Sequence, residues 1–194
     1  MGRGRLEAFS DGVIAIIITI MVLELEVPRS AELVALQPLW PTFLSYTLSY
    51  LYLGIYWNNH HHLLQATRCV NGRILWANLH LLFWLSLIPF VTGWMGENNF
   101  AALPVGLYGF VLLAAAVAYA VLSHVLTAHP ENRLILREAL GKDLKGKISI
   151  VGYVVAIPLA FLVPWVACML YVGTAAMWFI PDRRIETILA RRRS

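Results

Sequence analysis

Charged side chains are scarce in this sequence. Only 13% of its 194 residues are charged and 59% are hydrophobic, whereas a soluble domain carries about 25% charged and about 45–50% apolar residues. This composition argues against a water-soluble enzyme, which needs more polar surface to cover its core, and against a disordered chain. It predicts an all-α membrane protein, because the strands of an outer-membrane barrel alternate apolar and polar residues and these segments are apolar throughout.

Motifs of catalysis and of structural metal binding are also missing. The sequence has no HExxH, Gly-x-Ser-x-Gly or P-loop pattern, which are the signatures of zinc proteases, hydrolases and nucleotide-binding enzymes. Ser10 beside Asp11 has no base nearby in the sequence, so a hydrolase is poorly supported. Cys69 and Cys168 fit no CxxC or zinc spacing. We therefore expect no enzymatic activity, no cofactor, no resident metal, no small-molecule substrate and no nucleic-acid partner.

Long apolar runs make up most of the chain. A spanning helix needs about 20 apolar residues, and the predicted spans are 6–27, 40–64, 74–94 and 101–126, followed by 148–163 and 164–180. The last two come from one run that is too long for a single span and is interrupted by Pro158 and Pro164. Residues 129–147 are predicted to form a polar cytoplasmic linker with a short amphipathic helix, and residues 182–194 a basic tail. The chain is thus predicted to be one six-span unit, 1–194.

The distribution of positive charge supports six spans. With the N-terminus inside, Arg29 is the only Lys or Arg that falls on the outer side, whereas five spans would move the C-terminal arginines there. The positive-inside rule therefore places both termini in the cytoplasm. Arg191, Arg192 and Arg193 would then contact anionic membrane lipids.

The first apolar run begins with ionisable residues. Glu7 and Asp11 lie four residues apart on one helix face and should repel each other, so Arg5, a polar group on another helix or cytoplasmic water must compensate them. Two interpretations stay open: a hydrated helix end at the interface, or a buried polar cluster that fixes the helix at a subunit contact.

Four residues farther along this helix share one stripe, namely Ile16, Thr19, Ile20 and Leu23. Because nearly every neighbour is also apolar, periodicity does not show which surface this stripe meets, and lipid or core packing is the default for such side chains. Thr19 is the only polar residue in the helix centre. Its usual hydrogen bond is to a backbone carbonyl one turn earlier.

Three motifs occur in order along the first three spans. The first is Arg5-x-x-x-Phe9-Ser10-Asp11, the second is Tyr56-Trp57-Asn58-Asn59-His60-His61-His62-Leu63-Leu64, and the third runs from Asn78-Leu79 to Ser86-Leu87-Ile88-Pro89-Phe90. Together they resemble the signature of the transmembrane protein 175 family, the endolysosomal and prokaryotic potassium channels. The resemblance covers about half of the chain. Three histidines stand here where the family shows two, so the matching histidine stays open.

The resemblance implies a homotetramer in which the first helix of each subunit lines a central pore. Ile16, Ile20 and Leu23 would form its constriction, with Thr19 as a polar layer between them and permeant K⁺ passing near Ile16 and Thr19. A single six-span unit suggests the plasma membrane of a prokaryote. Two other functions stay open: a proton-coupled secondary transporter that uses Asp11 and a second-span histidine, although no paired halves are visible, and a non-conducting scaffold.

Such a pore would work without the usual potassium filter, since the chain has no Thr-Val-Gly-Tyr-Gly loop. A narrow ring of isoleucines tends to dewet and so blocks ions, and widening it would admit them. Thr19 hydroxyls would supply partial replacement oxygens. Glu24 and Glu26 would gather cations at the outer mouth, or they are simply solvated carboxylates at a helix end.

The histidine run also suggests two interpretations. Adjacent residues diverge by about 100° around a helix, so His60, His61 and His62 do not chelate one metal ion together. Hydrogen bonding to the polar cluster of the first helix is favoured, because unpaired polar groups are rare in membranes. One buried network of Arg5, Asp11, a histidine and Asn78 is therefore predicted, and the motif residues Phe9 and Ser10 are assigned to it as well.

Overall fold

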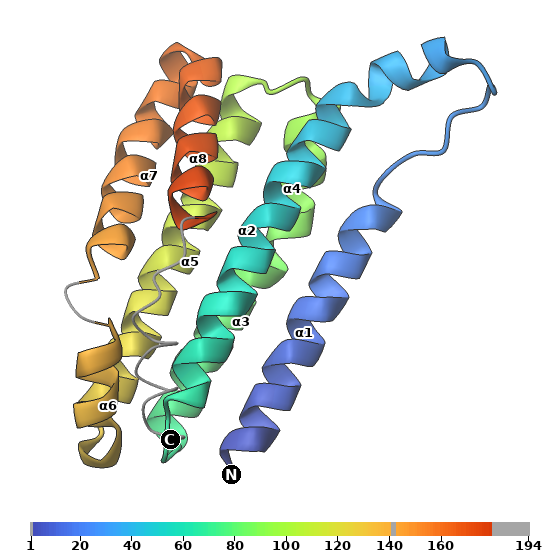
Figure 1. Ribbon diagram of the computed structural model, residues 1–194. Helices are drawn as coiled ribbons and strands as arrows, with labels where there is room; N and C mark the ends of the chain where they lie inside the picture. Colours follow the sequence, from blue (N-terminus) through green and yellow to red (C-terminus); the bar gives the residue numbers. More distant parts are fainter. Residues whose placement is uncertain (1, 141–142, 180–194) are drawn as a thin grey trace.

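The fold is all-α, as the composition predicts. The computed structural model describes residues 2–140 and 143–179, with the backbone alone for 137–140, and its helices pack side by side (Figure 1). The elements are α1 (Arg3–Leu23), the 3-10 helix η1 (Leu33–Leu39), α2 (Trp40–Gln65), α3 (Gly72–Ser86), α4 (Ile88–Glu97), α5 (Ala102–Ala128), α6 (Pro130–Leu140), α7 (Leu144–Leu162) and α8 (Pro164–Phe179). We call the end where α1 begins, α2 ends and α6 lies the N-terminal end of the bundle.

The segment predicted as the third span contains a helix break. α3 ends at Ser86 and α4 begins at Ile88, with Pro89 in its first turn. Proline lacks an N–H group and its ring crowds the carbonyl of the preceding turn, which accounts for the interruption at Leu87. The sequence predicts one span here, 74–94, without this break.

A second proline separates α7 from α8. Val163 has φ −143° and ψ 87°, outside the helical region, because the residue before a proline is disfavoured in the α conformation. α8 then starts at Pro164, whereas Pro158 stays inside α7. The predicted end of the last span at 180 and the basic tail 182–194, with Arg191, Arg192 and Arg193, lie outside the described residues.

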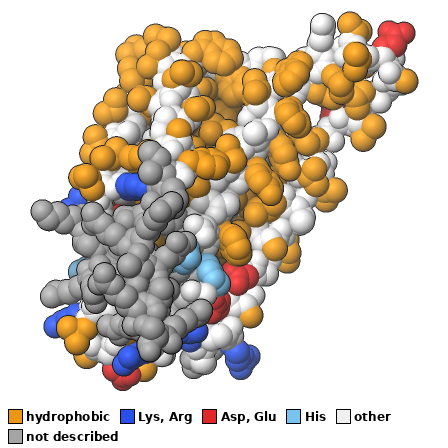
Figure 2. Space-filling view, in the orientation of Figure 1, with side chains coloured by type: hydrophobic (Ala, Val, Ile, Leu, Met, Phe, Trp, Pro, Cys, Tyr) orange, Lys and Arg blue, Asp and Glu red, His pale blue; other side chains and the backbone are white. Residues whose placement is uncertain are grey.

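Four helical segments of the described chain are long and apolar enough to cross a membrane. They are α1, the combined segment Gly72–Glu97, α5 and α7, while α8 is apolar but only 16 residues long. α2 has 26 residues, but its second half carries the polar run from Asn58 to His62. The six-span count therefore stays a prediction. Large hydrophobic side chains cover much of the bundle's visible side (Figure 2), as expected for a membrane protein.

The core lies around α5, and α1 lies at the edge. Tyr108, Leu112 and Leu122 of α5 are completely buried. Hydrogen bonds between helices reinforce this core, including Ser49 Oγ to Tyr108 Oη at 3.0 Å, as expected where no water is available to polar groups. Only 28% of the most apolar stretch of α1 and 22% of that of α7 are buried, against 50% for α5. Figure 1 shows α1 at one edge of the bundle and α7 at the opposite edge. A face of α1 is therefore left uncovered by the other described helices.

Candidate functional site

The free face of α1 carries the predicted constriction residues. Ile14 and Ile17 are 0% and 4% exposed and pack against the bundle, whereas Ile16 and Leu23 are 58% and 80% exposed. Ile20 lies between these extremes at 42%. The structure thus places the predicted stripe on the outward face of α1, neither inside the core of the chain nor against its other helices.

Thr19 lies on the same exposed face. Its hydroxyl donates to the backbone carbonyl of Ile16 at 2.9 Å, which is the hydrogen bond expected for a threonine inside a helix. Because the hydroxyl hydrogen is used in this bond, the oxygen lone pairs remain free to accept from water or to face a cation.

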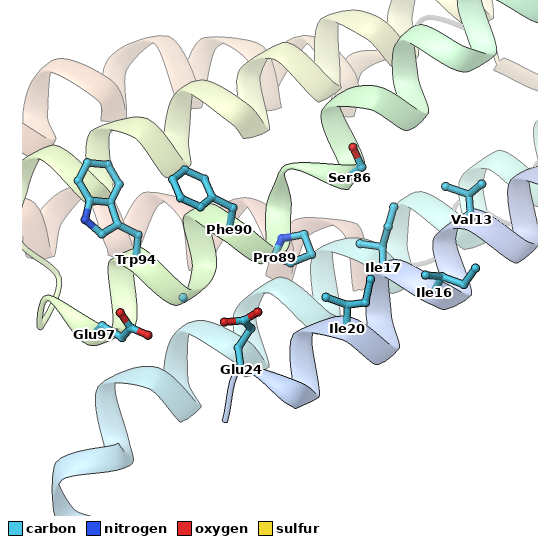
Figure 3. Close-up of a pocket in the computed structure, with 11 residues that line it drawn as sticks. Val13, Ile16, Ile17, Ile20, Glu24, Ser86, Pro89, Phe90, Trp94 and Glu97 are labelled. Carbon is cyan, nitrogen blue, oxygen red and sulfur yellow. The ribbon is translucent and has the colours of Figure 1, made fainter. Parts of the chain in front are cut away.

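A groove separates α1 from the break between α3 and α4. It has a volume of about 590 Å³ and is lined by Ile16 and Ile20 on one side and by Ser86, Phe90 and Trp94 on the other (Figure 3). Apolar side chains dominate its walls. The stripe is therefore flanked by an open apolar groove.

Three carboxylates gather at the far end of this groove. Glu24 follows α1 directly and Glu97 closes α4, and both line the groove (Figure 3). Glu26 joins them around a neighbouring cavity of about 540 Å³. Glu24 and Glu26 were predicted as an outer mouth because they follow the first span, whereas Glu97 follows the third span and was not singled out.

Buried polar side chains join α1, α2 and α3 near the N-terminal end of the bundle. His60 Nε2 lies 2.7 Å from Asn78 Oδ1, and Asn78 Nδ2 donates to Ser10 Oγ at 2.9 Å. Ser10 in turn donates to the carbonyl of Leu6 at 2.9 Å. All three side chains of this chain of bonds, Ser10, Asn78 and His60, are 0% exposed. His60 is therefore the histidine that joins the predicted network.

Of the α1 residues assigned to this network, Ser10 contacts Asn78, whereas Asp11 contacts Trp57. Asp11 is only partly buried and accepts a hydrogen bond from the Trp57 indole at 3.1 Å, so Ser10 takes the expected place beside Asn78. Arg5 and Phe9 are exposed. Arg3, which the sequence analysis did not single out, donates to the carbonyl of Gln65 at 3.0 Å and links the same helices.

The other predicted residues of this region lie around Glu7. His61 Nδ1 is 3.1 Å from Glu7 Oε1, and Arg3 Nε is 4.0 Å from Glu7 Oε2. Trp57 stacks on the imidazole of His61 with ring centroids 5.9 Å apart. His62 is half-buried and contacts the ring of His61. The repulsion between Glu7 and Asp11 is thus relieved by polar groups of a second helix, one of the options that the sequence left open.

Comparisons with known proteins agree with this arrangement. Residues 5–89 match the family described as endosomal/lysosomal potassium channel TMEM175, and this range contains Arg5, the histidine run and Asn78. A potassium channel of Chryseobacterium sp. (strain P1-3) is 53% identical over 189 residues, which is 97% of this chain and 98% of that one. The chain belongs to the TMEM175 family.

Further TMEM175 relatives extend the match over the fold. A potassium channel of Streptomyces collinus is 30% identical over 170 residues, 82% of each chain. The crystal structure of a lysosomal potassium-selective channel TMEM175 homologue from Chamaesiphon minutus superposes with a TM-score of 0.78 at 28% identity, covering 92% of this chain and 96% of that one. Because members of the TMEM175 family are named as channels, the expectation that the chain is no enzyme is confirmed.

Proposed function

We propose that the protein is a potassium channel in which four copies surround an axis and each α1 faces that axis. The observation that carries this proposal is the exposed stripe of Ile16, Ile20 and Leu23. Inside a membrane, this stripe would contact either lipid or another copy of the protein. The relatives named as potassium channels favour the second surrounding.

The same side chains provide a gate. Isoleucine offers no oxygen to replace the hydration shell of an ion, so a narrow ring formed by Ile16 or Ile20 of four subunits expels water and blocks conduction. Rotation or tilting of α1 would widen the ring and let it fill with water. The groove beside Ile16 and Ile20, about 590 Å³, gives these side chains space to move into.

Selectivity then depends on the cost of removing water from the ion. Potassium holds its water less tightly than sodium, so a partly dehydrating constriction favours potassium. The lone pairs of Thr19, which stay free because its hydroxyl hydrogen bonds Ile16, would replace part of the lost hydration. Glu24 and Glu26 would raise the local cation concentration at the outer mouth, and Glu97 adds a third carboxylate there.

The proposal includes the membrane arrangement. The six spans would be the four segments that are long and apolar enough to cross a membrane, together with α2 and α8. This arrangement would place the N-terminal end of the bundle in the cytoplasm. Arg3, Arg5, Arg68 and Arg73 are at or near the helix termini of that end, in agreement with the positive-inside rule. The membrane would be the plasma membrane of a prokaryote.

Reconstitution into liposomes tests this function. Vesicles that contain the purified protein and a potassium gradient should show potassium flux that needs no proton gradient, and the mass of the detergent complex should equal four chains. Flux that depends strictly on a proton gradient would point to a transporter, and vesicles as tight as protein-free ones would point to a scaffold. Either result would contradict the proposal.

A further inference from the structure

Two carboxylates of α1 and an imidazole of α2 converge near the N-terminal end of the bundle. One ligand atom from each of Glu7, Asp11 and His61 lies within 4.8 Å of the others, and each residue is partly buried. Glu7 and Asp11 come from adjacent turns of one helix, and His61 comes from the facing helix. This arrangement differs from the three adjacent histidines, which point in different directions and do not share an ion.

The imidazole of His61 is oriented for an additional partner. Its Nδ1 is shielded from solvent and lies 3.1 Å from Glu7 Oε1, yet within the described chain it makes no hydrogen bond. Its Nε2 lies 2.8 Å from the amide nitrogen of Gln65. A neutral imidazole has one protonated nitrogen and one free lone pair. With the Gln65 amide nitrogen donating to Nε2, the proton of His61 lies on Nδ1 and faces Glu7, and a metal ion that binds at Nδ1 would displace this proton.

Trp57 holds this group of side chains in place. Its indole N–H donates to Asp11 Oδ1 at 3.1 Å, which leaves the second carboxylate oxygen free, and its ring stacks on His61 at an interplanar angle of 22°. Outer contacts that fix the orientation of ligands are typical of metal sites. A single residue here orients ligands from both helices.

We propose that Glu7, Asp11 and His61 bind a divalent transition-metal ion of the zinc class and thereby join α1 to α2. One imidazole and two carboxylates are ligands that zinc accepts, with water as the fourth, whereas hard cations such as Mg²⁺ prefer oxygen alone. Ligand atoms around tetrahedral zinc lie about 3.4 Å apart at bond lengths of about 2.1 Å. Movements of about 1 Å by these side chains would therefore bring the three ligand atoms to the spacing that zinc needs. Arg3 near Glu7 weakens the attraction, but it is exposed.

A bound ion would restrain α1 at this end. It adds a link between α1 and α2 beside the hydrogen bond from Trp57 to Asp11, so rotation of α1 against α2 becomes harder. The effect on conduction rests on the proposed function, since it requires α1 to line the pore. The binding itself does not.

Zinc titration of the full-length protein tests the site. Purified protein, stripped with a chelator, is titrated with Zn²⁺ in competition with a fluorescent indicator, and one ion per chain is expected. Glu7→Gln and His61→Gln should each bind at least about tenfold more weakly, because even the loss of an outer contact weakens metal sites by about 10–100-fold. His62→Gln is the matched control, since His62 lies next to His61 but outside the cluster, and its affinity should stay unchanged.

Thermal unfolding provides a second measurement. Zn²⁺ should raise the melting temperature of the wild type and of His62→Gln, since a ligand that binds the folded state stabilises it, and Mg²⁺ at the same concentration should not. Absence of stoichiometric binding, or equal weakening by His62→Gln, would overturn the site. If Glu7→Gln or His61→Gln fails to fold, Asp11→Asn is tested in its place. Potassium flux of the metal-free protein tests the channel function separately, so failure of one proposal is distinguishable from failure of the other.

Discussion

Replacement of Asn78 by leucine tests the polar contact that holds α1 against the bundle. Asn78 is completely buried and bridges two helices through His60 Nε2 at 2.7 Å and Ser10 Oγ at 2.9 Å. Leucine has the same branched shape but is bulkier, so the change removes the hydrogen bonds and also crowds the site. The loss of stability expected from the hydrogen bonds alone is therefore a minimum.

The size of the destabilisation depends on whether Ser10 or His60 loses its last hydrogen-bonding partner. Ser10 keeps its bond to the carbonyl of Leu6, so on that side only the interhelical bond is lost, worth about 0.6 kcal/mol in membrane proteins. His60 Nε2 loses the partner that it has here, and a buried polar group without a partner costs about 1–3 kcal/mol. The hydrogen bonds alone should therefore account for a loss of about 1.6–3.6 kcal/mol in Asn78→Leu. Ser10→Ala leaves the buried Nδ2 of Asn78 without its acceptor and should cost about 1–3 kcal/mol.

Equilibrium unfolding in mixed detergent and dodecyl sulphate micelles, followed by helical circular dichroism, measures both values. Asn98→Ala is the control, because Asn98 is exposed and bonds only the carbonyl of Trp94 in its own helix turn. If Asn78→Leu proves no more destabilising than this control, the buried network does not hold α1. If Ser10→Ala is also no more destabilising than the control, the hydrogen bond from Asn78 to Ser10 does not contribute to stability.

Three further changes test the proposed pore and a surface contact. Ile16→Asn should hydrate the constriction and raise potassium flux in vesicles, while Val22→Asn, on another exposed face of α1, should not; equal flux in both would remove Ile16 from the pore. Thr19→Ala should lower the potassium to sodium permeability ratio by up to about fivefold, since a lost oxygen ligand is worth about 1 kcal/mol; an unmoved ratio contradicts the polar layer. The thiol of Cys69 donates to Glu131 at 2.8 Å, and this bond raises the pKa of Cys69. Glu131→Gln should lower that pKa and, near neutral pH and with the other cysteine removed, speed maleimide labelling of Cys69 about threefold or more; unchanged labelling would show that the bond is absent in solution.

The helical class could be predicted from the sequence because it depends on composition and run length, and the break at Pro164 was predicted as well. The break before Pro89 was not. Pro158 and Pro164 carry the same local constraint, yet Pro158 remains inside α7 while Pro164 begins α8. Pro89 interrupts its helix, although it was placed within a continuous span. A proline removes one backbone hydrogen bond of the helix, and the packing of neighbouring helices determines whether the chain bends or turns there.

The sequence does not show which α1 residue contacts Asn78, for a different reason. Ser10 shares the buried face of α1 with Ile14 and Ile17, but apolar residues surround the whole helix, so its sequence shows no inward side. Asp11 was favoured because charge is conspicuous in a sequence. The choice among the histidines likewise depends on the rotation of α2 relative to α3, which turns His60 toward Asn78 and His61 toward Glu7.

The unequal attachment of α1 has a mechanical consequence. Its beginning is held by the polar contacts of Ser10 and Asp11, whereas its second half packs through apolar side chains such as Ile17 and Met21 and its end at Leu23 runs into an exposed segment. We expect the far end to tilt more easily than the beginning. At about 1.5 Å per residue, Ile16 lies about 9 Å from Ser10 and Leu23 about 20 Å. A tilt of about 10° around Ser10 would displace Ile16 by about 1.6 Å and Leu23 by about 3.4 Å, so the outermost of the stacked rings would dilate about twice as far as the innermost.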